Sequence, residues 1–489
     1  MTRIHASIAA ALAAATRTAQ PPLTWNPVDH LLSRFAFGPT APARAWVTRY
    51  GIQAWYDNQL TLARTLKGYA GNAAVAAQGP LLAMTPAQAR EWMRLNGQEF
   101  GWAAMDQLTE VTLGLQVWST AQLYETLVDF FANHLNVANH NGDVWNTRHA
   151  YDRDVIRAHA SGDFTSMLLA SARHPAMLTF LNLAESSKDA VNENYGRELL
   201  ELHTVGMIYT EADVRNASYL LTGRKVDGSS RYVYDPSDHW TGPVQVLGFS
   251  HANASTADGA AGADAMIRYL ATHPSTATFL ARKLCIRFVS DRPSATLVAA
   301  VAKVYLASGT RILPMVSAIL RSDEFWAARG RKVRRPAENL VATLRVLGSR
   351  PKNWSQALRS LHWMSAAVGN VPLDWTPPDG YPDVAAKWRS SSTLLRLWEL
   401  HLGFAGNWWG EAFLAGDSVA LYGTATTSGE AIRKLGVRLT GAELSAAHRA
   451  ALQTFLGESA TTPLARSTLR WLLQPLIALI LDGPHHALR

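Results

Sequence analysis

Apolar residues recur at three- and four-residue spacing along most of the chain, which is the period of an amphipathic helix. Two clear examples are residues 85–101, TPAQAREWMRLNGQEFG, and residues 119–135, STAQLYETLVDFFANHL. Residues 209–223 add a capping box, in which Thr210 is followed three positions later by Asp213. The same spacing continues through later segments, namely 161–182, 273–290, 294–309, 311–326, 335–348, 391–404 and 445–457. The pattern therefore predicts a mainly α-helical protein.

Two stretches break the helical pattern. Residues 224–258 are rich in Gly, Ser, Asp and aromatic residues, and the segments RYVYD and VQVLGF within them predict a short hairpin or a structured loop. Residues 369–388 contain four prolines and two tryptophans, which excludes a helix there. Long loops inside a compact domain are often functional. Because no repeat or clean boundary appears, we expect a single large helical domain over residues 26–489, with two long irregular loops and at most a short β-hairpin.

Composition agrees with a globular protein, because 48% of the 489 residues are hydrophobic and only 17% are charged. No stretch approaches the roughly 18 consecutive apolar residues that a membrane span requires. The net charge is +8, but Lys and Arg are dispersed and no nucleic-acid module pattern appears, so nucleic acid is disfavoured as a partner. The single cysteine, Cys285, excludes an internal disulfide framework and a Cys-cluster metal site.

The first 25 residues form a separate segment in this prediction. The sequence MTRIHASIAAALAAATRTAQ combines a basic start with an Ala-rich run and has no twin arginine. It is typical either of an N-terminal tail, which we favour, or of a weak export segment. The compartment therefore stays open between the cytoplasm and export together with a partner.

Residues 191–206, VNENYGRELLELHTVG, concentrate ionisable chemistry in about four turns. If Asn192 caps a regular helix, Glu193, Arg197 and Glu201 form an i, i+4 stripe on one face. One interpretation is a solvated surface with weak ion pairs. The other is the wall of a buried pocket, where Arg197 keeps one carboxylate ionised while another titrates near neutral pH.

Two observations favour the pocket. Asn194 and Glu198 widen the polar stripe beyond what simple ion pairing needs. Gly196 lies in the middle of the predicted helix, where glycine costs roughly 1 kcal/mol relative to alanine, so another element is expected to approach its backbone closely. In this interpretation, Glu198 or Glu201 is a general acid or base and Arg197 is its charge partner.

Two histidines are predicted to lie on buried helix faces. His203 is on the apolar side of its segment, where a regular helix holds it too far from Glu198 and Glu201 to share one metal ion. His134 follows Asn133 and also lies on the apolar side of its helix. Each could be an ordinary core residue, or the two could face one another across a polar centre. A divalent metal held by histidine and carboxylate ligands between helices stays open as a cofactor.

No nucleophile motif or phosphate-binding glycine loop appears in the sequence. The chain is rich in tryptophan, with 17 residues of that type. Trp240, Trp375 and Trp388 lie in the two predicted loops, where they either pack in the core or stack on sugar rings. A glycan is therefore a candidate ligand.

Seven motifs occur in an order that resembles the bacterial family catalogued as domain of unknown function 1800. They are HLLSRFAFGPT, FFANHLNV, NENYGRELLELHTVG, YTEADVRNASYLLTG, LARKLCIRFVSDRP, EFW followed by KVRRPAENLVATLRVLG, and PPDGYPDVAAKW. The resemblance spans roughly residues 28–404, and the NENYGRELLELH stretch is highly specific to the family. It implies a largely helical fold, but no established reaction.

The resemblance also indicates functional residues and a partner. The matching positions are Asn133, His134, Asn192, Glu193, Asn194, Arg197, Glu198, Glu201 and His203. Members are often encoded beside a sulfatase-like family that typically carries an export signal, which suggests a sulfatase-like partner protein. One segment departs from the family pattern: His239 is kept, but Trp240 and Val244 stand where relatives usually have an acid and a lysine. If that segment is catalytic in relatives, the departure counts against activity here.

Two functions follow as expectations. The first is a hydrolase-like enzyme, with or without a metal, that acts on a glycan or similar polyhydroxylated substrate. Its site would comprise Arg197, Glu198, Glu201 and His134 as catalytic groups. The binding groups would be Asn133, Asn192, Glu193, Asn194, His203, His239 and Trp240. The second function is a non-catalytic assembly or binding partner of an exported sulfatase-like protein, in which the 192–203 helix is a structural keystone.

Overall fold

The computed structural model describes residues 26–66, 68–98 and 101–489. The predicted tail or export segment at 1–25 lies outside these residues. The described chain is mainly helical, which confirms the expected fold class. No described helix is both long enough and apolar enough to cross a membrane.

The chain divides into two compact units. Unit 1 comprises the residues up to Tyr56, Trp326–Asn370 and Val384–Arg489, and unit 2 comprises Asp57–Phe325 and Val371–Asp383. Because unit 1 is assembled from three separate segments, the sequence shows no boundary between the two. The expectation of one domain over residues 26–489 stays a prediction, since compact units can be parts of one domain.

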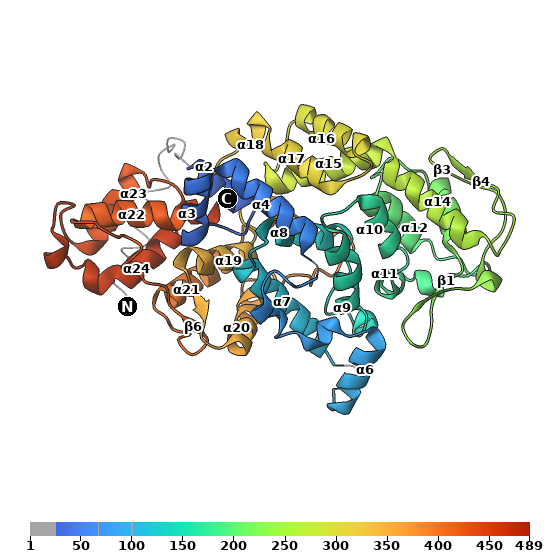
Figure 1. Cartoon of the computed structure of the whole chain (residues 1–489), viewed down its shortest axis with the longest axis horizontal. Helices are drawn as coiled ribbons and strands as arrows, with labels where there is room; N and C mark the ends of the chain where they lie inside the picture. Colours follow the sequence, from blue (N-terminus) through green and yellow to red (C-terminus); the bar gives the residue numbers. More distant parts are fainter. Residues whose placement is uncertain (1–25, 67, 99–100) are drawn as a thin grey trace. The chain divides into compact units, whose positions relative to one another are not determined.

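Unit 1 is mainly helical, and its C-terminal helices form a bundle. Its helices are α2 (Pro27–Arg34), α3 (Ala41–Tyr50), α19 (Pro336–Leu347), α20 (Trp354–Ala367), α21 (Ser391–Ala405), α22 (Ser428–Thr440), α23 (Ala446–Leu456), α24 (Leu469–Leu481) and α25 (Pro484–Ala487). Helix α24 packs against α21, α22 and α23, as Figure 1 shows for the red helices. The short strands β5 (Arg350–Pro351) and β6 (Phe413–Leu414) pair antiparallel.

Unit 2 is also helical and contains the motif-rich segments. Its α-helices are α5 (Ala73–Ala76), α6 (Pro86–Leu95), α7 (Ala103–Trp118), α8 (Gln122–His134), α9 (Arg148–Tyr151), α10 (Phe164–Ser171), α11 (Pro175–Phe180), α12 (Asn194–Glu198), α13 (Glu211–Leu221), α14 (Gly259–Thr272), α15 (Pro274–Phe288), α16 (Ala295–Ala307) and α17 (Ile312–Leu320). Helices α4 (Ile52–Thr65) and α18 (Asp323–Ala327) cross the division between the units. Helices α15, α16 and α17 pack together (Figure 1).

The predicted capping box is present at the start of α13. The Thr210 hydroxyl accepts a hydrogen bond from the Asp213 amide at 3.2 Å, and the Asp213 carboxylate accepts one from the Thr210 amide at 2.8 Å. Gly223 follows the helix with a φ of +84°, a conformation that ends helices and is readily available to glycine. Local sequence therefore defines both ends of this helix.

The irregular region after α13 contains two hairpins instead of one. RYVYD and VQVLGF do not pair with each other: β2 (Tyr232–Tyr234) pairs with β1 (Arg224–Val226), and β3 (Val244–Val246) pairs with β4 (Phe249–His251). The β3–β4 connection has positive φ at Leu247 and Gly248, as two-residue hairpin turns of type I′ require. Such a tight turn joins neighbouring strands, so each predicted strand takes its partner from its own side of the loop.

Candidate functional site

The 191–206 segment is not the regular helix that the sequence predicted. Helix α12 begins at Asn194 and is followed directly by a π-helical turn, Leu199–His203. The Thr204 hydroxyl ends the turn by donating to the Leu199 carbonyl at 2.6 Å. A π turn makes i→i+5 hydrogen bonds, so the 100° rotation per residue of a regular α-helix does not apply beyond residue 198. The predicted angular separation of His203 from Glu198 and Glu201 assumed that rotation. Short π turns of this kind often occur at functional sites.

The expected close approach at Gly196 is present. Helix α12 packs on α13, and a Cβ atom at Gly196 would lie 2.1 Å from the Ser218 hydroxyl oxygen. It would also lie 3.2 Å from the Val214 carbonyl oxygen. Glycine at this position therefore permits α13 to support the motif, which explains a residue that otherwise weakens a helix.

His134 and His203 are joined, but through a ring and a backbone group. The His134 Nε2 atom lies 3.1 Å from the His203 carbonyl oxygen, and the Lys283 ammonium lies 3.0 Å from His134 Nδ1. A carbonyl accepts and an ammonium donates, so Nε2 carries the proton of His134 and Nδ1 accepts. Burial, together with the nearby Lys283 charge, holds the pKa of His134 well below its ordinary value.

The His203 ring has no hydrogen-bond partner for either nitrogen among the described residues. Its side chain is 1% exposed, and its nearest aromatic neighbour is Tyr195, whose ring lies at 6.3 Å in an edge-on arrangement. Burial and the Lys283 charge lower the pKa of His203 to about 3, so the ring is neutral at physiological pH. An unpaired polar ring at such depth leaves two groups able to meet a ligand.

Lys283 is the main residue that sequence reasoning missed. It lies on α15 beside the apolar positions of that helix and is partly buried. Its Nζ atom lies over the Phe279 ring, 5.5 Å from the ring centroid. Burial lowers the pKa of Lys283 to about 8, against a smaller opposing effect of the Asp379 carboxylate. Two sequence signals were available: Lys283 lies within the family motif LARKLCIRFVSDRP, and it is a lysine on the flank of an apolar helix face, which normally indicates a solvated residue.

The acidic residues of the motif differ from one another in their surroundings. Glu198 makes no hydrogen bond or ion pair with other described residues, whereas Glu201 accepts a short hydrogen bond from the Tyr209 hydroxyl. Burial and the neighbouring Glu201 charge raise the pKa of Glu198 above its ordinary value. The Asp379 charge acts on both Glu198 and Lys283, raising the pKa of each.

Arg197 has a different partner from the one predicted. Its guanidinium binds Glu211 with two parallel hydrogen bonds of 2.8 Å and 2.7 Å, and its nearest approach to Glu193 is 3.8 Å. No ion pair joins Arg197 to Glu201 among the described residues. Arg197 therefore holds α12 to the start of α13 at the surface, and Glu211 is a contact that the sequence pattern did not indicate.

Asn133 connects α8 to the proline-rich segment 371–383. Its Oδ1 atom accepts a hydrogen bond from the Tyr381 amide at 2.9 Å, and a Cβ at Gly380 would lie 2.0 Å from the Asn133 carbonyl oxygen. Asn136 extends this contact by donating to the carbonyls of Trp375 and Pro377, each at 2.7 Å. These contacts hold the segment that carries Asp379, whose charge acts on Glu198 and Lys283.

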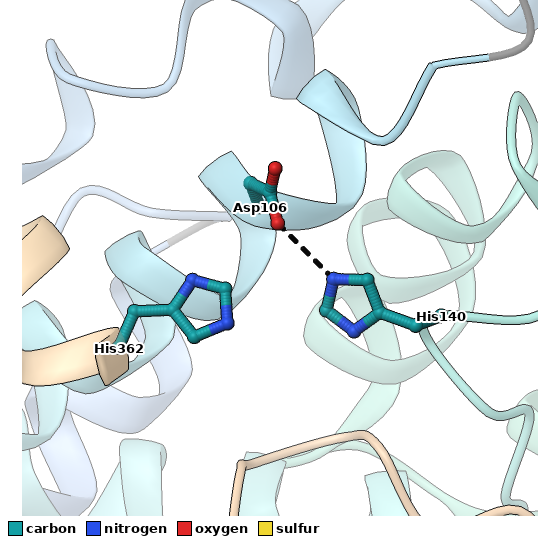
Figure 2. A group of neighbouring side chains, drawn as sticks. All are labelled: Asp106, His140 and His362. Carbon is teal, nitrogen blue, oxygen red and sulfur yellow. Dashed lines mark hydrogen bonds and ion pairs between the residues drawn. The ribbon is translucent and has the colours of Figure 1, made fainter. Parts of the chain in front are cut away.

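His140 holds the other end of the same segment. Its Nδ1 atom donates to Asp374 at 3.0 Å and its Nε2 atom donates to Asp106 at 3.1 Å, the latter shown in Figure 2. His362, also drawn there, belongs to unit 1. Burial lowers the pKa of His140, but the hydrogen bonds to Asp106 and Asp374 outweigh it and raise the pKa to about 9. The imidazole is therefore charged at neutral pH and acts as a clamp on Asp374.

The remaining predicted residues lie at the margin of this region or elsewhere. Asn192 accepts from the Asn194 amide at 2.9 Å, but the N-cap position of α12 is Glu193 and not Asn192 as predicted. His239 is buried against the Thr222 carbonyl and the Asn253 side chain, both at 2.9 Å, and Trp240 stacks on Tyr219. The described contacts of His239 and Trp240 do not include His134, His203, Lys283 or Glu198.

The geometry bears directly on a metal at this position. Both nitrogens of His134 are engaged, so His203 is the only one of the two histidines with a free nitrogen. Within the described part of unit 2, no three His, Cys, Asp or Glu side chains bring ligand atoms close enough together to hold one ion. The hydrogen bonds of His134 make the arrangement one of proton donors and acceptors. We name His134, His203, Lys283 and Glu198 the polar centre.

A family model described as "Protein of unknown function (DUF1800)" matches residues 30–488. The chain belongs to this family. The match extends beyond residue 404, where the resemblance to the motifs ended, so the C-terminal helices of unit 1 are part of the DUF1800 region as well. No curated protein and no solved structure matches the chain. The DUF1800 motifs FFANHLNV and NENYGRELLELHTVG supply three of the four residues of the polar centre.

Proposed function

We propose that this DUF1800 protein is an enzyme that transfers protons at the polar centre. The observation that carries the proposal is the hydrogen bond of 3.0 Å from Lys283 to His134, in a place where burial lowers the pKa of Lys283 to about 8. A lysine with an ordinary pKa is a poor acid at neutral pH, whereas one near 8 can give up its proton during catalysis.

Glu198 supplies the complementary group. Its pKa is raised, so at neutral pH its carboxylate is a stronger base than an exposed glutamate. The environments thus shift Glu198 and Lys283 towards neutrality from opposite directions, a pattern that marks acid and base pairs. In this assignment Glu198 is the general base, Lys283 is the general acid, and His134 is a positioning residue that holds the lysine.

Hydrolysis is the reaction class that these roles fit best. The base removes a proton from an attacking water molecule while the acid protonates the leaving group. A glycan or similar polyhydroxylated substrate is supported by the aromatic surface of the 371–383 segment, where the rings of Trp375 and Tyr381 lie 5.0 Å apart. The Trp375 indole donates to Asp379 at 2.7 Å, which ties this surface to the carboxylate that acts on the polar centre.

Labelling of Lys283 tests the acid without any substrate. Reaction of the native protein with acetic anhydride at increasing pH, read by mass spectrometry, should modify Lys283 with a midpoint at about pH 8. The exposed Lys303 on α16 is the control in the same digest. In Glu198→Gln the midpoint should move by less than in Asp379→Asn, because Asp379 is the charge that acts on Lys283. A labelling curve for Lys283 that coincides with that of Lys303 would contradict the proposal.

Hydrolysis of a panel of methyl glycosides, whose alcohol leaving group needs protonation by the acid, tests the reaction class. Glu198→Gln and Lys283→Met should each lower kcat/KM by about 10²- to 10⁴-fold, while the matched surface variants Glu185→Gln and Lys303→Met should not. The rate should fall above about pH 8 as Lys283 loses its proton, and this limb should shift to higher pH in Lys283→Arg. Turnover that survives both substitutions in the polar centre would exclude these roles.

A second function has its own support. Met207 and Ile208 directly follow the motif and are 77% and 51% exposed, which is unusual for adjacent large apolar residues. They favour a role as the assembly or binding partner of an exported sulfatase-like protein. Co-purification with such a partner, lost in Met207→Ser/Ile208→Ser but kept in Lys283→Met, would favour this function over catalysis.

A further inference from the structure

Unit 1 contains an open cavity of about 570 Å³ beside helix α22. Its lining includes four cationic residues, Arg44, Arg433, Lys434 and Arg438, and one acidic residue, Asp29. Its lining also includes the 420–424 turn, in which Ala420, Gly423 and Thr424 are exposed. A volume of this size is in the range of small-molecule sites, which are typically 300–1,000 Å³.

Three of the four cations have carboxylate partners. Arg44 binds Asp29 at 2.5 Å. Lys434 binds Glu430 at 2.9 Å, and Arg433 lies 3.8 Å from Glu443. Arg438 has no ion-pair partner among the described residues, although it is partly buried. The cavity wall therefore carries one positive charge that no side chain within ion-pair distance compensates.

Two N–H groups in this wall are buried without an acceptor among the described residues: Nη2 of Arg44 and Nε of Arg438. Arg44 Nη1 donates to the backbone carbonyl of Arg438 at 2.7 Å, which places the Arg44 guanidinium beside residue 438. Burial, followed by the like charge of Arg44, lowers the pKa of Arg438. The Asp29 carboxylate binds Arg44 and its charge also acts on Arg438, but it accepts no hydrogen bond from either of these two N–H groups. A buried donor that is left without an acceptor is costly.

We infer that this cavity binds the phosphate group of a small phosphorylated molecule. Arg44 and Arg438 each contribute one donor without an acceptor, and arginine is preferred over lysine where an oxyanion is bound. A phosphate monoester carries about −1.5 to −2 charges at pH 7, which suits Arg438 together with the rim cations Arg433 and Lys434 better than a single carboxylate charge does. The remaining volume is available for the rest of the molecule.

The test uses the full chain with inorganic phosphate as the probe, in calorimetry at constant ionic strength. Wild type should bind phosphate, and Arg438→Gln should bind it at least about tenfold more weakly because it loses a charge-assisted donor. Arg438→Lys keeps the charge but not the fork, so its affinity should be intermediate. Arg470→Gln is the matched control, because Arg470 is exposed on the same unit and lies outside the cavity lining.

Circular dichroism shows whether each variant is folded before phosphate affinities are compared. If Arg438→Gln is not folded, the phosphate affinity of Arg438→Lys is compared with that of wild type. Acetate is titrated in parallel. Wild type that does not bind phosphate, or Arg438→Gln and Arg438→Lys variants that bind it as tightly as Arg470→Gln, would overturn the inference. Acetate binding as tight as phosphate binding would overturn the assignment to a phosphate group. The polar centre of unit 2 plays no part in these outcomes.

Discussion

Unit 2 contains two groups of ionisable residues that are each built on a π turn, and they are arranged in opposite ways. One is the polar centre, at the turn Leu199–His203. The other, the Arg157 cluster, comprises Arg157, Asp152, Glu125 and Tyr69, at the π turn Asp152–Arg157. In the Arg157 cluster, opposite charges meet directly. In the polar centre, a lysine meets a neutral imidazole, and a carboxylate has no partner.

The Arg157 cluster has the properties of a structural keystone. Arg157 lies 2.8 Å from Asp152 and 3.0 Å from Glu125, and all three side chains are almost fully buried. Its guanidinium also lies over the Tyr69 ring, 4.5 Å from the centroid, and Tyr69 donates to Asp152 at 3.0 Å. A keystone role was one of the two functions considered for the 192–203 motif. The paired and sealed charges that a keystone requires are found at the π turn Asp152–Arg157 and not at the turn Leu199–His203. This difference favours the proposed reactive role for the polar centre.

The largest expected effect is on the Arg157 cluster. Arg157→Met should lower the free energy of unfolding by about 3–5 kcal/mol, because it leaves two buried carboxylates without their cation. Urea denaturation followed by circular dichroism measures the change. The exposed Arg282 provides a matched control, since Arg282→Met removes the same side chain from the surface of unit 2. Similar stability in the two variants would contradict the keystone assignment.

An intermediate effect is expected for the pH dependence of stability at Lys283. Its pKa is lowered from 10.5 to about 8 on folding, so the folded state binds fewer protons in that window and stability rises with pH. Relative to Lys283→Met, wild type should gain about 2 kcal/mol of unfolding free energy between pH 7 and pH 10.

The pH dependence of stability also distinguishes the polar centre from the Arg157 cluster. The pKa of Arg157 is raised, so the difference between wild type and Arg157→Met should stay flat over this pH range. Lys303→Met, the surface control, should also follow wild type. A difference between wild type and Lys283→Met that stays flat over this pH range would show that Lys283 titrates as it does in the unfolded chain.

The smallest effect is expected at the clamp on segment 371–383. Asp374→Asn removes one of the two carboxylates that raise the pKa of His140, so this pKa should fall below its value of about 9 in nuclear magnetic resonance titrations. The cost should be about 0.5–1 kcal/mol, since the pair is partly exposed. Because the pKa of His140 is raised on folding, its contribution is complete below pH 6.5 and is lost as pH rises through about 9.

Hydrogen exchange shows whether the contact between His140 and Asp374 restricts the motion of segment 371–383. Amides of segment 371–383 should exchange faster in Asp374→Asn than in wild type, while those of the Arg157 cluster should not change. The exposed Asp189 supplies the control variant Asp189→Asn. Equal protection of the segment in both variants would mean that the Asn133 and Asn136 contacts hold it without His140.

Sequence reasoning found the candidate residues but not most of their partners. The periodicity of the 119–135 segment correctly predicted that His134 is buried on its helix, and Gly196 correctly indicated a close neighbour. The assumption of regular helical geometry failed after Glu198, because nothing in the local spacing indicates a π turn. Glu211 was missed as the partner of Arg197, and Tyr209 as the partner of Glu201, because the prediction considered only residues of the same helix.

The sequence by itself determined the helical class, the helix ends with capping residues, and the identity of the motif that belongs to this family. These features depend on neighbours within about four positions, where backbone hydrogen bonds and side-chain caps act. Only the tertiary structure decided which ionisable groups are paired. His134 contacts His203 and Lys283, which are separated from it by 69 and 149 positions in the sequence. No local pattern encodes such contacts. Packing brings those groups out of water, and desolvation then decides which of them keep a charge.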